Sequence, residues 1–178
     1  MILVVCTGNL HRSPMLEALI AAEGLGPVSS AGLHSPGGGA PPLMARAAAD
    51  AGFDLSRHES RQLTPQMLAD ARLVLCMERD HVAEIALMHR PAFARTLTLR
   101  EAQQLFVAHR PATDHTIEEW LAVAIGARKA SDVLSAPRTW DTPDPIGGGL
   151  DDFRACVADI IDTAQPVLAG LRRLRADT

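Results

Sequence analysis

Short apolar runs alternate along the chain with longer segments in which apolar residues recur every three or four positions. Short runs of this kind are typical of buried strands, whereas the wider spacing is typical of helices. The runs predict strands at residues 2–5, 28–31, 72–77 and 96–99. The spacing predicts helices at residues 15–23, 43–51, 65–69, 80–89, 101–109, 116–128 and 153–174, the last with a kink or break at Pro166.

Because strands and helices alternate, the pattern predicts βαβ units with right-handed crossovers, and therefore a parallel sheet. We expect an α/β fold: a single doubly wound domain over residues 1–178, with a central four-stranded parallel sheet and helices on both faces. A chain of 178 residues has the usual size of one domain. Residues 110–138 mix charge, alanine and proline, and we interpret them as a helical insertion between the fourth strand and the final helix.

Composition and charge exclude several classes of partner. Hydrophobic residues make up 47% of the chain and the formal net charge is −4, so neither nucleic acid nor an anionic membrane surface is an expected partner. The three cysteines are widely spaced without a C-x-x-C pair, which argues against a disulfide framework and a zinc site. Unpaired cysteines, no signal-peptide core and no apolar stretch of membrane-spanning length together predict a cytoplasmic protein.

The stretch that follows the first strand has the composition of an anion-binding loop. Cys6 stands at the carboxyl end of that strand, where open parallel sheets bind their ligands. Gly8 and Asn9 tolerate the backbone angles that turn successive N–H groups toward one anion. Arg12 supplies a forked cation, and Ser13 with the proline after it predicts an N-cap and a helix start. The positive end of that helix favours both a bound anion and a thiolate at Cys6.

This stretch matches the pattern V-C-x-G-N-x-x-R-S-P and resembles the low-molecular-weight protein tyrosine phosphatases. The resemblance implies a phosphomonoester hydrolase that acts through a phosphocysteine, with Cys6 as the nucleophile and Arg12 as the phosphate-binding cation. No metal or cofactor is expected, because the loop and Arg12 supply the positive field. The phosphate-binding positions are then Thr7, Gly8, Asn9, Leu10, His11, Arg12 and Ser13.

A second chemical feature is the segment W-D-T-P-D-P at residues 140–145. Loss of a phosphoryl group to a thiolate requires a proton for the leaving group, and a carboxylic acid on a loop stiffened by prolines can supply it. The family carries its general acid as the aspartate of a late Asp-Pro pair, which points to Asp144. Asp141 is a second candidate, but no proline follows it.

Two further roles are implied by the resemblance alone. Ser30, in Ser-Ala-Gly, and His58, in His-Glu-Ser-Arg, match positions from which the family holds the loop asparagine in a strained conformation. Here that asparagine is Asn9.

The departures from the family pattern leave the substrate open. His11 occupies the position where many members have a second cysteine that protects the nucleophile as a disulfide, so we expect no such protection. Ile146 replaces a tyrosine of the substrate cleft, which removes an aromatic wall for phosphotyrosine. Leu10 resembles the bulky aliphatic residue of tyrosine-type members rather than the threonine of phosphoarginine phosphatases. The expected partner is a phosphorylated protein or a small phosphate ester, and the sequence does not predict the oligomeric state.

Two other functions remain open at this point. An arsenate reductase of the same fold would use Cys6 as its nucleophile, but it needs nearby resolving cysteines. A non-catalytic phosphate-binding regulatory module would keep the loop without turnover. A cysteine hydrolase acting on acyl groups is disfavoured, because Arg12 in a phosphate-sized loop has no role in that chemistry.

Overall fold

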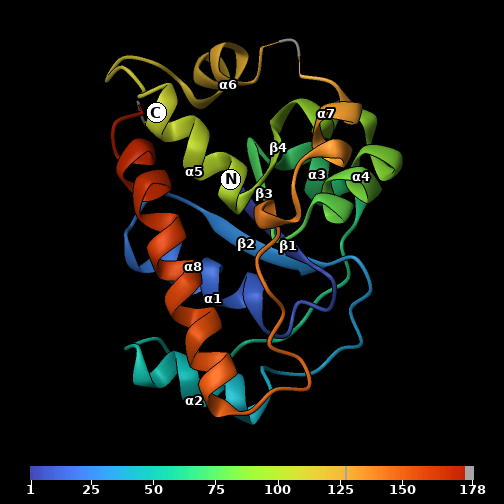
Figure 1. Ribbon diagram of the computed structural model, residues 1–178, viewed down its shortest axis with the longest axis vertical. Helices are drawn as coiled ribbons and strands as arrows, with labels where there is room; N and C mark the ends of the chain where they lie inside the picture. Colours follow the sequence, from blue (N-terminus) through green and yellow to red (C-terminus); the bar gives the residue numbers. More distant parts are fainter. Residues whose placement is uncertain (127, 175–178) are drawn as a thin grey trace.

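A computed structural model describes residues 1–126 and 128–174 and shows the expected α/β fold (Figure 1). The four strands are parallel and lie in the order β2-β1-β3-β4. In the register of the sheet, Val5 pairs with Ala31 on one side and with Cys76 on the other. The strands are β1 (Ile2–Cys6), β2 (Val28–Gly32), β3 (Leu73–Cys76) and β4 (Thr96–Thr98).

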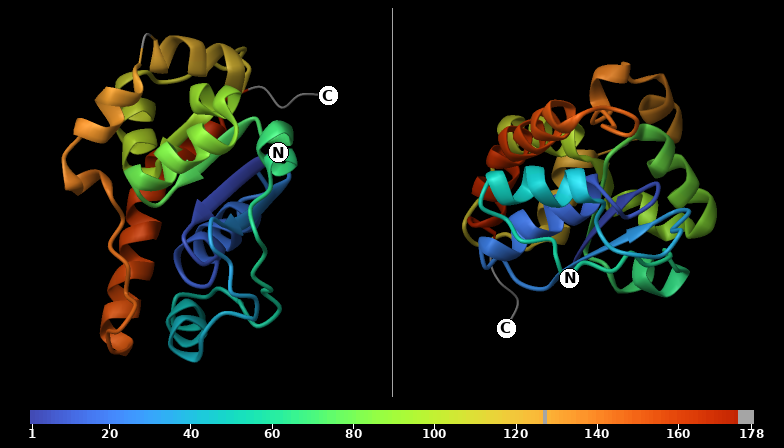
Figure 2. Two further views of the ribbon diagram at one scale, coloured as in Figure 1. Left: turned by 90° about the vertical axis from the view of Figure 1, so that its right-hand side faces the viewer. Right: turned by 90° about the horizontal axis from the view of Figure 1, so that it is seen from below.

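Helices cover both faces of the sheet, as predicted for a doubly wound fold (Figure 2). The helices are α1 (Arg12–Ala22), α2 (Pro42–Asp50), α3 (Pro65–Asp70), α4 (Arg79–Met88), α5 (Leu99–Ala108), α6 (Ile117–Ile125), α7 (Ala130–Ser135) and α8 (Leu150–Leu171), with short 3-10 turns η1 (Arg90–Arg95) and η2 (Arg138–Trp140).

Successive side chains of β1 point to opposite faces of the sheet, and both faces are buried, which explains why the whole strand is apolar. Ile2, Val4 and Cys6 point to the face covered by α1, α5 and α8, whereas Leu3 and Val5 point to the face covered by α3 and α4. A strand that is buried on both faces has no solvent side, so it reads as a continuous hydrophobic run. This double burial holds the end of β1 rigidly in the centre of the sheet.

Two sequence-based expectations differ from the structure. Of the kink or break expected at Pro166, the break is wrong: α8 continues through Pro166, and it packs against α1, α2 and α5 along its length (Figure 1). Those contacts offset the backbone hydrogen bond that a proline removes. α1 begins at Arg12 with His11 at the N-cap position, so Ser13 lies inside the helix and does not cap it. The Ser13 hydroxyl contacts Cys6 instead.

The segment at residues 110–138 contains α6 and α7 and is attached to the fold by buried contacts. The Trp120 ring stacks on Phe106 with centroids 3.8 Å apart, and its Nε1 donates a hydrogen bond to the His109 carbonyl at 2.6 Å. Downstream, the Arg128 guanidinium donates to Glu101 Oε2 at 2.9 Å. Thus buried contacts from both α6 and the residues before α7 join this segment to α5.

Replacing Arg128 by alanine should lower the free energy of unfolding by about 3–5 kcal/mol, because it leaves a buried carboxylate without its partner. The side chains of Arg128 and Glu101 are only 7% and 5% exposed, and burial raises the pKa of Glu101. Urea unfolding followed by circular dichroism measures the loss. The double variant Arg128→Met with Glu101→Leu should recover most of it, since it removes both charges together. A loss below about 1 kcal/mol in Arg128→Ala would contradict a structural role for the pair.

Among the described residues, no helix combines the length and the apolar character needed to span a membrane.

Candidate active site

The predicted nucleophile lies at the carboxyl end of β1, which has β2 on one side and β3 on the other. The connection after β1 leads to β2, whereas the connection after the neighbouring β3 leads to β4 in the opposite direction, and open α/β sheets bind ligands at such a point. Cys6 is 3% exposed. Its Sγ accepts a hydrogen bond from the Asn9 N–H at 3.2 Å and lies 3.0 Å from Ser13 Oγ. Because Asn9 Nδ2 donates to the same Ser13 oxygen, the Ser13 proton is available to stabilise negative charge on the sulfur.

The carbonyl groups of the loop are bonded to neighbouring segments. The Cys6 carbonyl accepts from Leu33 N–H at 3.0 Å, and the Thr7 carbonyl accepts from His34 N–H at 2.8 Å. In a trans peptide the C=O and the following N–H point in opposite directions, and no peptide bond in the described structure is cis. The N–H groups that follow these carbonyls, at Thr7 and Gly8, are therefore directed away from the anchoring segment. This orientation suits a loop whose donors converge on an anion.

Asn9 has a left-handed backbone conformation with φ of 54° and is completely buried. Its Nδ2 donates to Ser30 Oγ at 2.7 Å, its Oδ1 accepts from Arg61 N–H at 2.9 Å, and its carbonyl accepts from His58 Nε2 at 2.6 Å. The structure thus brings both Ser30 and His58 into contact with Asn9. These bonds compensate for a backbone conformation that non-glycine residues rarely adopt.

Gly32, at the end of β2, packs directly against the loop of predicted phosphate-binding positions at residues 7–13, the phosphate loop. A Cβ atom at this position would lie 2.8 Å from the Thr7 carbonyl oxygen and 2.9 Å from Asn9 N. Only glycine permits this approach between two backbones. The Ser-Ala-Gly segment therefore shapes the loop through the absence of a side chain as well as through the Ser30 hydroxyl.

Arg12 and Asp144 meet across 132 positions of sequence. The Arg12 side chain is 2% exposed, and its Nη2 donates to Asp144 Oδ2 at 2.5 Å. Its Nη1 donates to Glu78 and to the Thr142 carbonyl, the latter at 2.9 Å. Asp144 Oδ1 also accepts from Ile146 N–H at 3.1 Å, so a local turn orients the carboxylate. The tertiary fold therefore places the predicted acid beside the cation of the phosphate loop.

The second candidate acid, Asp141, lies elsewhere. Its carboxylate is bound by Arg79 at the start of α4, with Nη2 to Oδ2 at 3.0 Å. Of the two aspartates, Arg12 binds the carboxylate of Asp144 and not that of Asp141.

His11 adds an aromatic contact to the loop. Its ring meets Phe153 of α8 edge-on, with centroids 5.4 Å apart. Burial lowers the pKa of His11, an effect that outweighs the opposing influence of Asp144, so the imidazole is mainly neutral at pH 7.

The other two cysteines are buried and free. Burial raises the pKa of Cys76 well above its usual value and that of Cys156 to about 12. Both are therefore thiols at neutral pH. Because the thiolate is the reactive form, neither is suited to relay a disulfide from Cys6, as an arsenate reductase would require.

Two functional neighbours, Glu78 and His81, were missed from the sequence. His81 is 3% exposed, and its Nδ1 accepts from Glu78 N–H at 3.2 Å. Burial lowers the pKa of His81 to about 4, so the neutral ring carries its proton on Nε2 and donates to Thr7 Oγ1 at 3.0 Å. Glu78 follows β3 at the same sheet edge as Cys6, and this position was the available signal.

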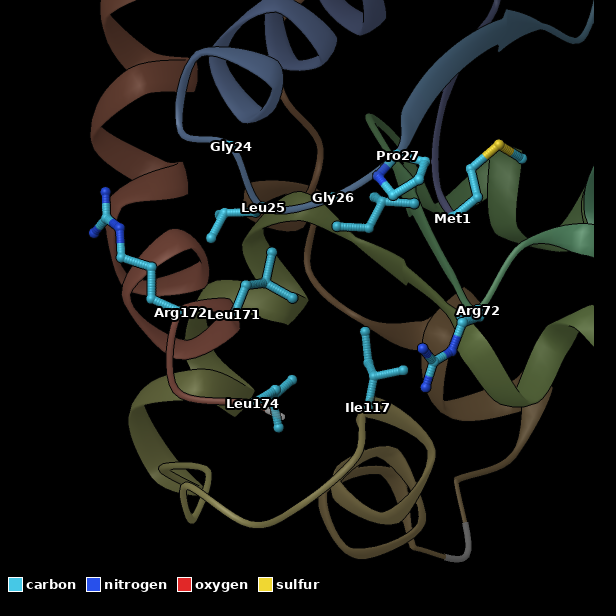
Figure 3. A pocket seen from close by; sticks show the side chains of 11 residues that line it. Met1, Gly24, Leu25, Gly26, Pro27, Arg72, Ile117, Leu171, Arg172 and Leu174 are labelled. Carbon is cyan, nitrogen blue, oxygen red and sulfur yellow. The ribbon is translucent and has the colours of Figure 1, made fainter. Parts of the chain in front are cut away.

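A separate cavity of about 410 Å³ lies at the opposite end of the strands (Figure 3). Met1 and Ile2 line it together with Arg72 and Arg172, which are bound by Glu118 and Glu23 respectively. Because Ile2 begins β1 and Cys6 ends it, this cavity is remote from the phosphate loop. Within residues 1–126 and 128–174, no group of three His, Cys, Asp or Glu side chains is placed to hold a metal ion.

Residues 1–111 match the model of the low molecular weight phosphotyrosine protein phosphatase family. The chain belongs to this family. Among relatives of this phosphatase, a probable low molecular weight protein-tyrosine-phosphatase EpsP of Ralstonia nicotianae is 37% identical over 109 residues, which cover 60% of this chain and 75% of EpsP.

Solved structures of the family resemble the phosphatase over almost its whole length. The tyrosine phosphatase AmsI of Erwinia amylovora superposes with a TM-score of 0.70 and 25% identity, covering 94% of this chain and 90% of AmsI. The YwlE arginine phosphatase of Geobacillus stearothermophilus gives a TM-score of 0.71 and 25% identity, covering 96% and 92%.

Family membership makes this protein a cysteine-dependent phosphatase that acts on phosphorylated substrates, and it does not favour arsenate reduction. The family match ends at residue 111, before the loop of Asp144. The case for Asp144 as the acid therefore depends on its contact with Arg12.

Proposed function

We propose that this phosphatase hydrolyses phosphate monoesters through a phosphocysteine at Cys6, with Asp144 as general acid and base. The observation that carries the proposal is the convergence of Cys6, Arg12 and Asp144 at one sheet edge. It supports the proposal because a thiol, a guanidinium and a carboxyl group have the chemistry of a nucleophile, a phosphate-binding cation and a proton donor. A reducing compartment, the cytoplasm, suits a reaction that needs Cys6 as a free thiolate.

In the first step the Cys6 thiolate attacks phosphorus in line with the leaving group. The loop N–H groups and the Arg12 guanidinium bind the equatorial phosphoryl oxygens. Arg12 Nη1 is held by Glu78 and the Thr142 carbonyl, whereas Nη2 is bound to Asp144. A phosphoryl oxygen that takes the place of Asp144 on Nη2 releases the carboxyl group for proton transfer. Substrate binding and availability of the acid are coupled in this way.

In the second step water hydrolyses the phosphocysteine. The Asp144 carboxylate, which gave its proton to the leaving group, now accepts a proton from the attacking water. The sulfur leaves as a thiolate, stabilised by the Asn9 N–H and the Ser13 hydroxyl. The same phosphate loop serves both steps, because the equatorial oxygens keep their positions while the apical groups, the attacking and leaving atoms, change.

The substrate class within the family is tested by a panel of phosphotyrosine peptide, phosphoarginine peptide and a small alkyl phosphate. Ile146 is 72% exposed beside the acid, where it offers an aliphatic surface. We expect turnover of the phosphotyrosine peptide, because Leu10 resembles the tyrosine-type members. Mass spectrometry of acid-quenched enzyme should detect a phosphoryl group on Cys6. Tight phosphate binding without turnover on any substrate would support the non-catalytic module instead.

Replacing Asp144 by alanine should lower kcat/KM, which reports formation of the phosphocysteine, by about 10²–10³-fold for phenyl phosphate, whose leaving group needs a proton, and much less for p-nitrophenyl phosphate. Asp144→Asn is the matched control, since it retains the shape and the turn with Ile146 but cannot transfer a proton. Both variants should show the same leaving-group dependence in steady-state assays. Equal rates for wild type and Asp144→Asn would remove Asp144 from the mechanism.

A further inference from the structure

The loop that carries Asp144 (the acid loop) is attached to the turn between β3 and α4. Thr142 N–H donates to the Met77 carbonyl at 2.7 Å, and Met77 N–H donates to the Val5 carbonyl of β1 at 3.2 Å. The same turn supplies Glu78, which binds Arg12. The phosphate loop and the acid loop are thus both hydrogen-bonded to the same short segment between β3 and α4.

Arg79, the first residue of α4, makes the most extensive of these contacts. Its backbone N–H donates to Asp141 Oδ1 at 2.9 Å, and its Nε and Nη2 reach the same carboxylate at 3.1 and 3.0 Å. Its Nη1 donates to the Ala136 carbonyl and, at 3.4 Å, to the Leu134 carbonyl at the end of α7. The guanidinium therefore holds both the helix end and the residue from which the acid loop departs.

Little freedom remains between Asp141 and the acid. The Thr142 carbonyl is bound by Arg12, and Pro143 has a restricted φ angle. Asp141 and Asp144 are therefore joined by only two residues of restricted conformation, and a displacement of Asp141 strains that segment. The Arg79 and Asp141 side chains are 13% and 23% exposed, so the pair is largely shielded from solvent. Burial alone would raise the pKa of Asp141, but the hydrogen bonds from Arg79 reverse this effect and keep the carboxylate ionised.

We propose that Arg79 is a positioning residue that sets Asp144 for proton transfer by holding Asp141. It does not touch the reacting atoms, and it acts only through the acid loop. The inference rests on the proposed role of Asp144 as general acid. It predicts a leaving-group-dependent defect in formation of the phosphocysteine, because in that step a misplaced acid slows only the substrates whose leaving group needs the proton.

The test compares kcat/KM, which reports formation of the phosphocysteine, for phenyl phosphate and p-nitrophenyl phosphate. Arg79→Ala should lower kcat/KM for phenyl phosphate by about ten- to a hundredfold and change that for p-nitrophenyl phosphate far less. The dissociation constant of inorganic phosphate should stay within about twofold, since the contact of Arg12 with Glu78 does not involve Arg79. Arg79→Ala added to Asp144→Ala should cause no further loss.

A matched control is available in Arg100, which binds Asp159 at 2.6 Å between α5 and α8. Arg100→Ala removes a similar ion pair away from the acid loop and should keep the wild-type ratio of kcat/KM for phenyl phosphate to kcat/KM for p-nitrophenyl phosphate. If Arg79→Ala does not fold, Asp141→Asn weakens the same contact and should lower this ratio in the same way. Equal losses on both substrates, or additive losses with Asp144→Ala, would overturn the inference. A fully active Asp144→Ala enzyme would instead overturn the proposed function itself.

Discussion

Serine in place of Cys6 should reduce turnover of p-nitrophenyl phosphate by at least about 10³-fold. A serine hydroxyl is not ionised at neutral pH, whereas the site is built to stabilise negative charge on sulfur. The Asn9 N–H lies 3.2 Å from Sγ and the Ser13 hydroxyl 3.0 Å from it. The oxygen can still accept these bonds, so the loop should keep its shape. Steady-state kinetics of the purified variant measures the loss.

Phosphate binding is the control for this variant. Because the loop carbonyls and Arg12 keep their partners, calorimetry should give a dissociation constant for inorganic phosphate close to that of the wild type. Turnover by Cys6→Ser at the wild-type rate would rule out Cys6 as the nucleophile. Loss of phosphate binding together with turnover would show that the thiol is needed for the loop structure itself.

Alanine in place of Gly32 should lower kcat by about 10²-fold, although Gly32 touches no reacting atom. The added Cβ would lie 2.8 Å from the Thr7 oxygen and 2.9 Å from both Gly8 C and Asn9 N. These are backbone atoms, so either the phosphate loop or β2 must shift. We expect a loss of about 1–3 kcal/mol in the free energy of unfolding as well. Kinetics and urea unfolding of the same preparation measure both effects.

Gly149→Ala is a suitable comparison for this substitution. A Cβ atom at Gly149 has its nearest neighbour at 3.9 Å, which is an ordinary contact. That variant should keep wild-type kcat and lose little stability. If Gly32→Ala behaved in the same way, the close packing of β2 on the phosphate loop would have no functional consequence.

The fold was readable from the sequence because its physical signals are local. Ile2 to Val5 and Leu73 to Cys76 are apolar throughout, and both prove to be strands buried on two faces. The errors occur where tertiary contacts outweigh a local preference. Pro166 lies within α8 because neighbouring helices hold that helix along its length. Serine is a residue type that favours the N-cap position, but Ser13 lies inside α1 and its hydroxyl contacts the Cys6 sulfur.

The candidate site was only partly readable. Cys6 and Arg12 stand six positions apart in one recognisable pattern, so the sequence identified them directly. Asp144 was singled out by the proline that follows it and by the resemblance to the family. Glu78 and His81 belong to no such pattern, since their roles depend on Arg12 and Thr7, which are more than 60 positions away.

The sequence by itself determined the chemistry of this protein: a thiol, a phosphate-sized loop and a cation at the end of a central strand. These features are contiguous, and their spacing along the backbone is enough to define them. The proline after Asp144 and the family resemblance favoured this aspartate over Asp141, but only the tertiary structure decided which of the two carboxylates contacts Arg12. The fold brings Arg12 to Asp144 and Arg79 to Asp141, and neither pairing is encoded by proximity in the chain.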